Sequence, residues 1–260
     1  MQKKVWITSL QKDKKKTTAL LELSKKYGLS PDGHFWVDDL KKMAWQAPKD
    51  GICAKETGLW IISAEPEDLE AESVRYGLSL LALTVQAVKG IGFPILFVCF
   101  DNMLEQEGLP APFQGAEVVE GKNSSLGAKI AARANTPAKK VAADYRVNIH
   151  ANPGYGIWFE FGPAGKEVWK GVLAGACGAQ VDAHGVGEAG RLPEKAVLEY
   201  PMQGLKLSVS DTEYNAWAVQ NRIGSDESYY ARFNGIPGTV LFGELPGEGN
   251  EGDLYKLRLS

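Results

Sequence analysis

The sequence predicts an α/β fold, with an N-terminal, mainly parallel sheet flanked by helices and a β-rich (α+β) C-terminal domain. The first hundred residues contain four short apolar runs separated by stretches of helical character. Strands that are buried on both faces of a parallel sheet have this appearance. Beyond residue 143, alternating segments punctuated by glycine are typical of antiparallel strands. We therefore expect an α/β domain over 1–117, a linker or crossover helix over 118–143 and a β-rich domain over 144–260.

The predicted strands of the first domain cover residues 5–7, 35–37, 59–62 and 95–100, and polar side chains follow each of them. In chain order these are Thr8 and Ser9, then Asp38 and Asp39, then Ser63 and Glu65, and finally Asp101. The carboxyl ends of parallel strands share one edge of the sheet, and ligands of such sheets bind there. The sequence thus predicts a ligand site at this edge.

Helices are expected between these strands. The first covers 17–26 and ends near Gly28, and a weak one covers 125–134. The clearest begins after Pro66 and extends to residue 88, where Gly90 and Gly92 end it. Its first turns are acidic, as the helix dipole favours, with Glu67, Asp68, Glu70 and Glu72. Residues 39–51 and 102–117 are expected to be loops, the second with the alternative of a crossover.

In the second half of the sequence, the pattern predicts a hairpin of residues 145–150 and 156–161 around a turn at 152–154. Further strands are expected at 196–200, 205–209, 229–233, 239–242 and 254–259, with an acidic loop at 247–253 before the last. Residues 167–181 fit either a helix of small residues or a pair of strands. The tryptophans and tyrosines of this half fit a packed core or a recognition surface, and they are Trp158, Trp169, Trp217, Tyr155, Tyr229 and Tyr230.

Composition narrows the classes of function. The formal charge of -3 gives no electrostatic reason to expect a nucleic-acid partner. Polar residues interrupt the longest apolar helical stretch, 74–88, so a membrane span is not expected. Residues 1–6 lead straight into the first predicted strand, so a signal peptide is not expected either. Cys53, Cys99 and Cys177 have neither disulfide nor metal-site spacing, which favours reduced thiols and a cytoplasmic location.

The strand ends supply the candidate site residues. Thr8, Ser9, Asp38, Asp39 and Asp101 are the predicted ligand-binding residues, able to contact a ribose hydroxyl or a divalent cation. If the protein is an enzyme, a carboxylate would stabilise an oxocarbenium-like ribosyl transition state, and the candidates are Glu65, Glu70 and Glu72. The lysine-rich segment 12–18 lacks the glycines of a phosphate-binding loop, which favours a solvated helix start.

A second constellation lies in the β-rich half. Asp182 and His184 share one face if their segment is extended, and Glu188 could join them in a metal or acid–base site. The neighbouring Gly185 and Gly187 instead favour a loop with a surface histidine. Both interpretations remain open from the sequence.

The order of elements over residues 1–105 resembles a Toll/interleukin-1 receptor (TIR) domain or another flavodoxin-like domain. A first strand ending in Thr8-Ser9, a second ending in Asp38-Asp39, and a third ending in Ser63 resemble TIR strands. The resemblance implies NAD or a related nucleotide as ligand. NAD-cleaving TIR domains carry a glutamate in the helix after the third strand, where this chain has residues 73–78 without one.

These observations lead to a first hypothesis, a cytoplasmic protein that handles or senses a nucleotide or a nucleotide-derived small molecule. The cofactor is left open. The alternative is a non-catalytic interaction or assembly protein, in which the aromatic-rich β domain recognises a protein partner or a second copy of the chain. A third hypothesis is a metal-dependent hydrolase that uses Asp182, His184 and Glu188.

Overall fold

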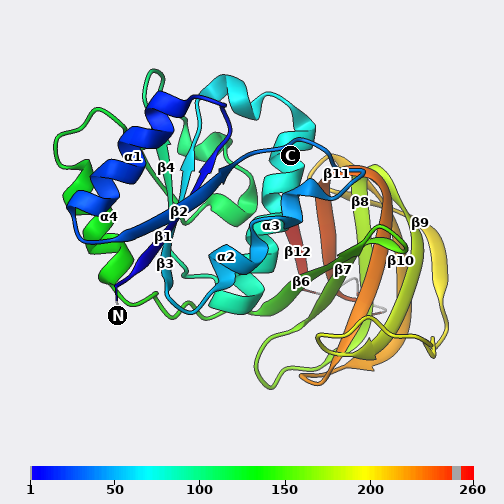
Figure 1. Cartoon of the computed structure of the whole chain (residues 1–260). Coiled ribbons are helices and arrows are strands. Elements are labelled where there is room, and N and C mark those ends of the chain that lie inside the picture. Colours follow the sequence, from blue (N-terminus) through cyan, green and yellow to red (C-terminus); the bar gives the residue numbers. More distant parts are fainter. Residues whose placement is uncertain (1, 248–252) are drawn as a thin grey trace. The chain divides into compact units, whose positions relative to one another are not determined.

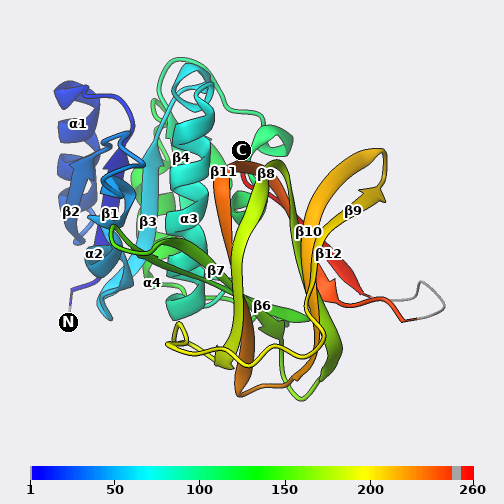
Figure 2. The same ribbon diagram turned by 90° about the vertical axis from the view of Figure 1, so that its right-hand side faces the viewer.

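The computed structural model describes residues 2–247 and 253–260, and it has the predicted fold class. The chain divides into two compact units, Met1–Val141 and Ala142–Ser260. The first is a parallel sheet flanked by helices and the second is an antiparallel β structure (Figure 1, Figure 2).

The first unit contains five parallel strands in the order β2-β1-β3-β4-β5. They are β1 (Lys4–Ser9), β2 (Ser30–Phe35), β3 (Thr57–Ser63), β4 (Ile95–Cys99) and β5 (Glu117–Glu120). The chain moves outward from β1 to β2, then crosses back to β3 on the other side of β1. This reversal is a topological switch point, and ligands of open α/β sheets bind beside the carboxyl ends of the strands there.

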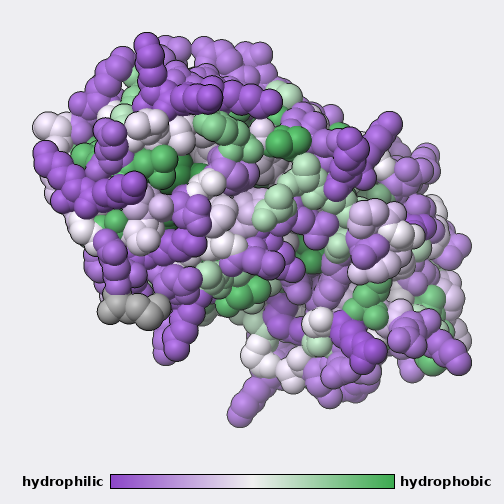
Figure 3. Space-filling view, viewed as in Figure 1, coloured by the Kyte–Doolittle hydropathy of each residue, from purple (hydrophilic) through white to green (hydrophobic). Residues whose placement is uncertain are grey.

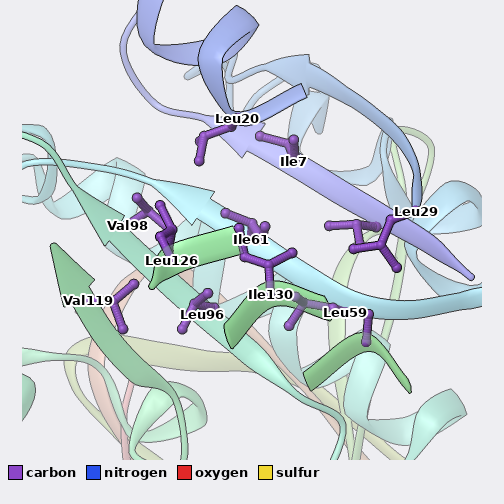
Figure 4. Close-up of a cluster of buried hydrophobic side chains, with 12 residues drawn as sticks. Ile7, Leu20, Leu29, Leu59, Ile61, Leu96, Val98, Val119, Leu126 and Ile130 are labelled. Atoms are coloured by element: carbon purple, nitrogen blue, oxygen red, sulfur yellow. The ribbon is translucent and has the colours of Figure 1, made fainter. Parts of the chain in front are cut away.

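Helices cover both faces of this sheet (Figure 1). α1 (Lys14–Lys26) and α4 (Leu126–Asn135) contact each other on one face, and α2 (Lys49–Cys53) and α3 (Glu72–Lys89) contact each other on the other. Short 3₁₀ turns occupy Ala44–Gln46, Pro66–Leu69, Gln106–Gly108 and Ala111–Phe113. Alternate strand residues such as Ile7, Ile61 and Leu96 meet Leu20 of α1 and Ile130 of α4 in a buried apolar cluster (Figure 4).

The predicted helices and three of the four predicted strands of this unit are confirmed, whereas the second strand was placed wrongly. β2 is the mostly polar segment Ser30–Phe35, which overlaps the predicted strand 35–37 only at Phe35. β2 is an edge strand that pairs with β1 alone, so the continuous apolar pattern of central strands does not apply to it. Asp38 and Asp39 therefore lie beyond the strand end, in the connection to α2.

The segment 118–143, expected as a linker or crossover helix, contains most of β5 and the whole of α4. Both elements belong to the first unit, whose boundary is at residue 141. The loop expected at 102–117 holds two 3₁₀ turns and leads into β5.

The second unit is a seven-stranded antiparallel sheet in the order β6-β7-β11-β8-β10-β9, with β12 paired to β11. Its strands are β6 (Tyr145–Asn152), β7 (Gly156–Pro163), β8 (Trp169–Glu188), β9 (Met202–Val209), β10 (Thr212–Ile223), β11 (Glu227–Glu244) and β12 (Leu254–Arg258). The long strands β8 and β11 pair along most of their length, with irregular register at two places.

The predicted hairpin is confirmed as β6 and β7, and the strands at 205–209 and 254–259 are confirmed as β9 and β12. Of residues 167–181, which were expected as a helix or a pair of strands, 169–181 belong to a single strand, β8. Residues 229–233 and 239–242 both belong to β11. The strand expected at 196–200 is wrong, because this segment is a connection in which Tyr200 has a φ of 46°. Residues 248–252 of the acidic loop lie outside the described residues.

The face of the molecule seen in Figure 3 is mainly hydrophilic, with small scattered apolar areas. Among the described residues, no helix combines the length and the apolar character that a membrane crossing requires.

Candidate functional site

A buried carboxylate lies where β3 ends. Glu65 is only 4% exposed, and its oxygens accept hydrogen bonds from the backbone N–H groups that follow β4. Phe100 and Asn102 donate at 2.9 Å each, and Asp101 donates at 3.2 Å. Burial alone would raise the pKa of Glu65, but the bonds from Asn102, Lys16 and Phe100 hold that pKa below its ordinary value. The ionised side chain of Glu65 therefore fixes the position of the connection that follows β4.

Lys16, in the first turn of α1, joins this carboxylate to Asp101. Its Nζ atom lies 3.0 Å from Glu65 Oε1 and 2.8 Å from Asp101 Oδ2. Burial alone would lower the pKa of Lys16, but the hydrogen bonds to Asp101 and Glu65 raise it above its ordinary value. The lysine-rich segment is thus only partly a solvated helix start, since Lys14 and Lys15 are exposed and Lys16 is not.

A second lysine forms an ion pair with Asp101. Lys122, which follows β5, places its Nζ atom 3.2 Å from Asp101 Oδ1. The side chain of Asp101 is 56% exposed, and that of Lys122 is 65% exposed. The two lysines hold the pKa of Asp101 below its ordinary value. Residues Lys16, Glu65, Asp101 and Lys122, which we call the edge cluster, connect α1, β3, β4 and β5 at the carboxyl edge of the sheet (Figure 1).

Thr8 and Ser9 are buried beside this edge. Thr8 Oγ1 accepts a hydrogen bond from the Trp60 indole at 2.8 Å, and its side chain is fully buried. Ser9 donates to the Gln11 carbonyl at 2.6 Å, and the Gln11 side chain accepts from Lys16. The hydroxyl groups of Thr8 and Ser9 therefore bond to neighbouring protein atoms at the end of β1.

Asp38 and Asp39 bind other partners. Asp38 accepts a hydrogen bond from Ser73 at 2.6 Å, which ties the connection after β2 to the start of α3. Asp39 pairs with Lys42 at 3.3 Å and accepts from its backbone N–H group. The structure thus brings Glu65 and Asp101 together, whereas Asp38 and Asp39 form separate contacts.

The other two candidate catalytic acids lie at the start of α3, and both side chains are exposed. The Glu70 carbonyl accepts a hydrogen bond from Arg75 at 2.7 Å. Glu72 is the first residue of the helix, where its charge complements the helix dipole. Of the three predicted acids, only Glu65 belongs to the edge cluster, and its oxygens already accept several hydrogen bonds.

Asp182, His184 and Glu188 lie on β8 but contact different partners. Asp182 pairs with Arg232 at 2.8 Å, and His184 Nδ1 lies 2.9 Å from the Tyr229 hydroxyl. The Glu188 carbonyl accepts from the Tyr230 hydroxyl. Within residues 2–247 and 253–260, no group of three His, Cys, Asp or Glu side chains is arranged to hold a metal ion.

A polar group in the second unit was not predicted. Glu160 on β7 is 3% exposed, and its Oε2 atom lies 2.6 Å from His150 Nε2. The Gly190 N–H group and the Ser228 hydroxyl donate to Oε1 at 2.7 and 2.8 Å. Burial would raise the pKa of Glu160, but the bonds from His150, Gly190 and Ser228 lower it below the ordinary value. The predicted hairpin was the available signal for this group, because its register sets Asn148 opposite Glu160 and so makes His150 a diagonal neighbour of Glu160.

No protein-family profile matches this sequence, and no curated protein is similar enough to be identified as a relative.

Proposed function

We propose that this protein binds a nucleotide, or a small molecule derived from one, at the carboxyl edge of the parallel sheet. The phosphate would bind at the edge cluster. The observation that supports this is the convergence of Lys16 and Lys122 on the half-exposed carboxylate of Asp101. An incoming phosphate oxygen would take the place of an Asp101 oxygen and accept the same charge-assisted hydrogen bonds.

Two features of the surroundings support the same proposal. The cluster lies at the strand ends, beside the switch point between β1 and β3 where ligands of such sheets bind. The first turn of α1 contains Lys14, Lys15 and Lys16, and their positive charges favour an anion. The Asp13 carboxylate already caps this helix and accepts from the Lys15 and Lys16 N–H groups, so the lysine side chains and not these amides would bind the phosphate. The strand order β2-β1-β3-β4-β5 also supports the resemblance to TIR-like and flavodoxin-like domains, because flavodoxin-like sheets have this order.

The arrangement favours sensing over turnover. A carboxylate that stabilises an oxocarbenium-like ribosyl transition state needs an oxygen directed at the substrate. Both oxygens of Glu65 accept hydrogen bonds from the protein, and Glu70 and Glu72 are exposed. If NAD turnover is detected, the Glu65→Gln, Glu70→Gln and Glu72→Gln variants decide whether any of these acids contributes. Unchanged turnover in all three would exclude them.

A thermal-shift screen tests the proposal. A ligand that binds only the folded state stabilises it by RT ln(1 + [L]/Kd), which is about 2.7 kcal/mol at a hundredfold excess over Kd. The compounds are NAD, ADP-ribose, ATP, cyclic nucleotides and FMN, with inorganic phosphate as the control for anion binding alone. A clear rise in Tm with one nucleotide class supports the proposal. No rise with any nucleotide contradicts it.

We also propose a cytoplasmic location, which the three free thiols of Cys53, Cys99 and Cys177 fit. The alternative function is a non-catalytic interaction or assembly protein. Val197 and Tyr200 favour it, because they are 78% and 75% exposed in the connection between β8 and β9. Concentration-dependent association in sedimentation experiments, reduced in Val197→Ser, would support this alternative.

A further inference from the structure

One face of the second unit carries a row of polar and aromatic side chains across neighbouring strands. In the register of the sheet, His150 on β6 lies opposite Trp158 on β7, and Trp158 lies opposite Arg232 on β11. On β8 the residue opposite Arg232 is Ala183, and the adjacent Asp182, at an irregularity in the register, extends the row through its 2.8 Å ion pair with Arg232. We call His150, Trp158, Arg232 and Asp182 the sheet strip.

Hydrogen bonds to neighbouring residues hold the side chains of the sheet strip in place. Buried Glu160 fixes the imidazole of His150 through the 2.6 Å contact with its Nε2 atom. The Trp158 indole donates to the Tyr155 carbonyl at 2.9 Å, and Arg232 donates to the same carbonyl at 3.2 Å. The guanidinium of Arg232 lies 5.4 Å from the centre of the Trp158 ring. These bonds reduce the rotamer freedom that ligand binding would otherwise have to remove.

The hydrogen bonds within the strip leave polar atoms for a ligand. His150 contacts Glu160 through Nε2, which leaves Nδ1 outside that bond. Arg232 donates to Oδ1 of Asp182. Within the part of the chain that the structure describes, Nδ1 of His150 and Oδ2 of Asp182 are left to bond with hydroxyl groups, which can both donate and accept.

The charged side chains of this region are paired. Arg232 pairs with Asp182 at 2.8 Å, and Nη1 of Arg146 lies 3.8 Å from Glu160. An indole ring beside hydroxyl-binding side chains suits a ligand with apolar C–H faces and many hydroxyls.

We propose that the sheet strip is a binding site for a short, uncharged oligosaccharide. One sugar ring would stack on Trp158, and hydroxyl groups would bond to His150 and Asp182. Adjacent strands are about 4.8 Å apart, so His150 and Arg232, two strands apart, span roughly 10 Å. This proposal is independent of the nucleotide proposal, because a neutral sugar carries neither a phosphate nor a base.

The test observes the indole N–H resonances of the full chain by NMR during titration with maltotriose, cellotriose and triacetylchitotriose. The Trp158→Phe variant assigns the Trp158 resonance. We expect one trisaccharide to shift this resonance, with saturation at millimolar concentrations. Failure of all three to shift it overturns the proposal.

Two variants and a control then locate the site. Trp158→Ala and Asp182→Asn should each weaken the affinity about tenfold, equivalent to about 1.4 kcal/mol. Asp182→Asn keeps the shape of the side chain, so it tests the site even if Trp158→Ala does not fold. Tyr200→Ala removes an exposed aromatic ring outside the strip and should leave the affinity unchanged. Equal affinity of wild type and Asp182→Asn would overturn the assignment of Asp182.

Discussion

The carboxylate of Glu65 and the ammonium group of Lys16 lie 3.0 Å apart, although 49 residues separate them along the chain. The contact joins the end of β3 to the first turn of α1. Because Glu65 also accepts from the backbone that follows β4, one side chain fixes three segments at the carboxyl edge. This support fixes the positions of Lys16 and of the Asp101 backbone.

Glu65→Gln should destabilise the first unit. Glutamine replaces one acceptor oxygen with an N–H donor, which would face the backbone donors of Asp101 and Asn102. An unsatisfied buried donor costs about 1–3 kcal/mol, measurable as a lower midpoint of urea unfolding. Glu70→Gln is the control, because the side chain of Glu70 is exposed. Equal stability of the two variants would refute the structural role of Glu65.

Glu160 should make stability depend on acidic pH. The folded-state pKa of Glu160 lies below its ordinary value of 4.5, so the unfolded chain takes up the proton first as the pH falls. The contribution of Glu160 is therefore fully present above pH 4.5 and is lost below it. Unfolding free energies measured over this range should fall less steeply in Glu160→Gln than in the wild type. Parallel curves would be the contrary result.

His34 should remain neutral well below its ordinary titration range. Burial lowers the pKa of His34 from 6.5 to about 4, and its Nδ1 atom accepts from the Trp6 indole at 3.2 Å. The unfolded chain binds this proton first, so stability falls as the pH decreases from 6.5 toward 4. An NMR titration of the imidazole measures this pKa directly. Titration near 6.5 would contradict the burial of this ring.

Gly51→Ala should be destabilising, although alanine normally favours a helix over glycine. A Cβ atom at Gly51 would lie 2.0 Å from Cζ3 of Trp6, and such overpacking costs about 1–3 kcal/mol. Gly108→Ala is the control, since its Cβ would meet no atom within 4 Å. Thermal unfolding of both variants compares them. A Gly51→Ala variant as stable as Gly108→Ala would mean that the Trp6 ring moves freely.

The central strands could be predicted because burial on both faces requires continuous apolar runs. β2 could not, since an edge strand needs few apolar residues, and its sequence Ser30–Phe35 is mostly polar. β10 was missed for a related reason, because Thr212–Ile223 mixes small and polar residues that only its pairing with β8 and β9 explains.

The candidate site was predicted in part. The strand ends correctly indicated Glu65 and Asp101 as neighbours, because parallel strands bring their carboxyl ends together. The ion pairs of Asp101 with Lys16 and Lys122 were not predicted. A lysine-rich helix start such as that of Lys16 has the same sequence whether its side chains are solvated or paired. Such contacts depend on strand order, which one sequence does not reveal.

The most direct test of the nucleotide proposal is calorimetric titration of ADP-ribose and ATP into the wild type and two lysine variants. Lys122→Met removes an exposed partner of Asp101, and Lys206→Met removes an exposed lysine of the second unit that pairs with Glu213 at 3.7 Å. We predict that at least one nucleotide binds, and that Lys122→Met alone weakens binding by about tenfold, or about 1.4 kcal/mol. Binding that is absent in the wild type, or equal in both variants, would contradict a phosphate site at the edge cluster.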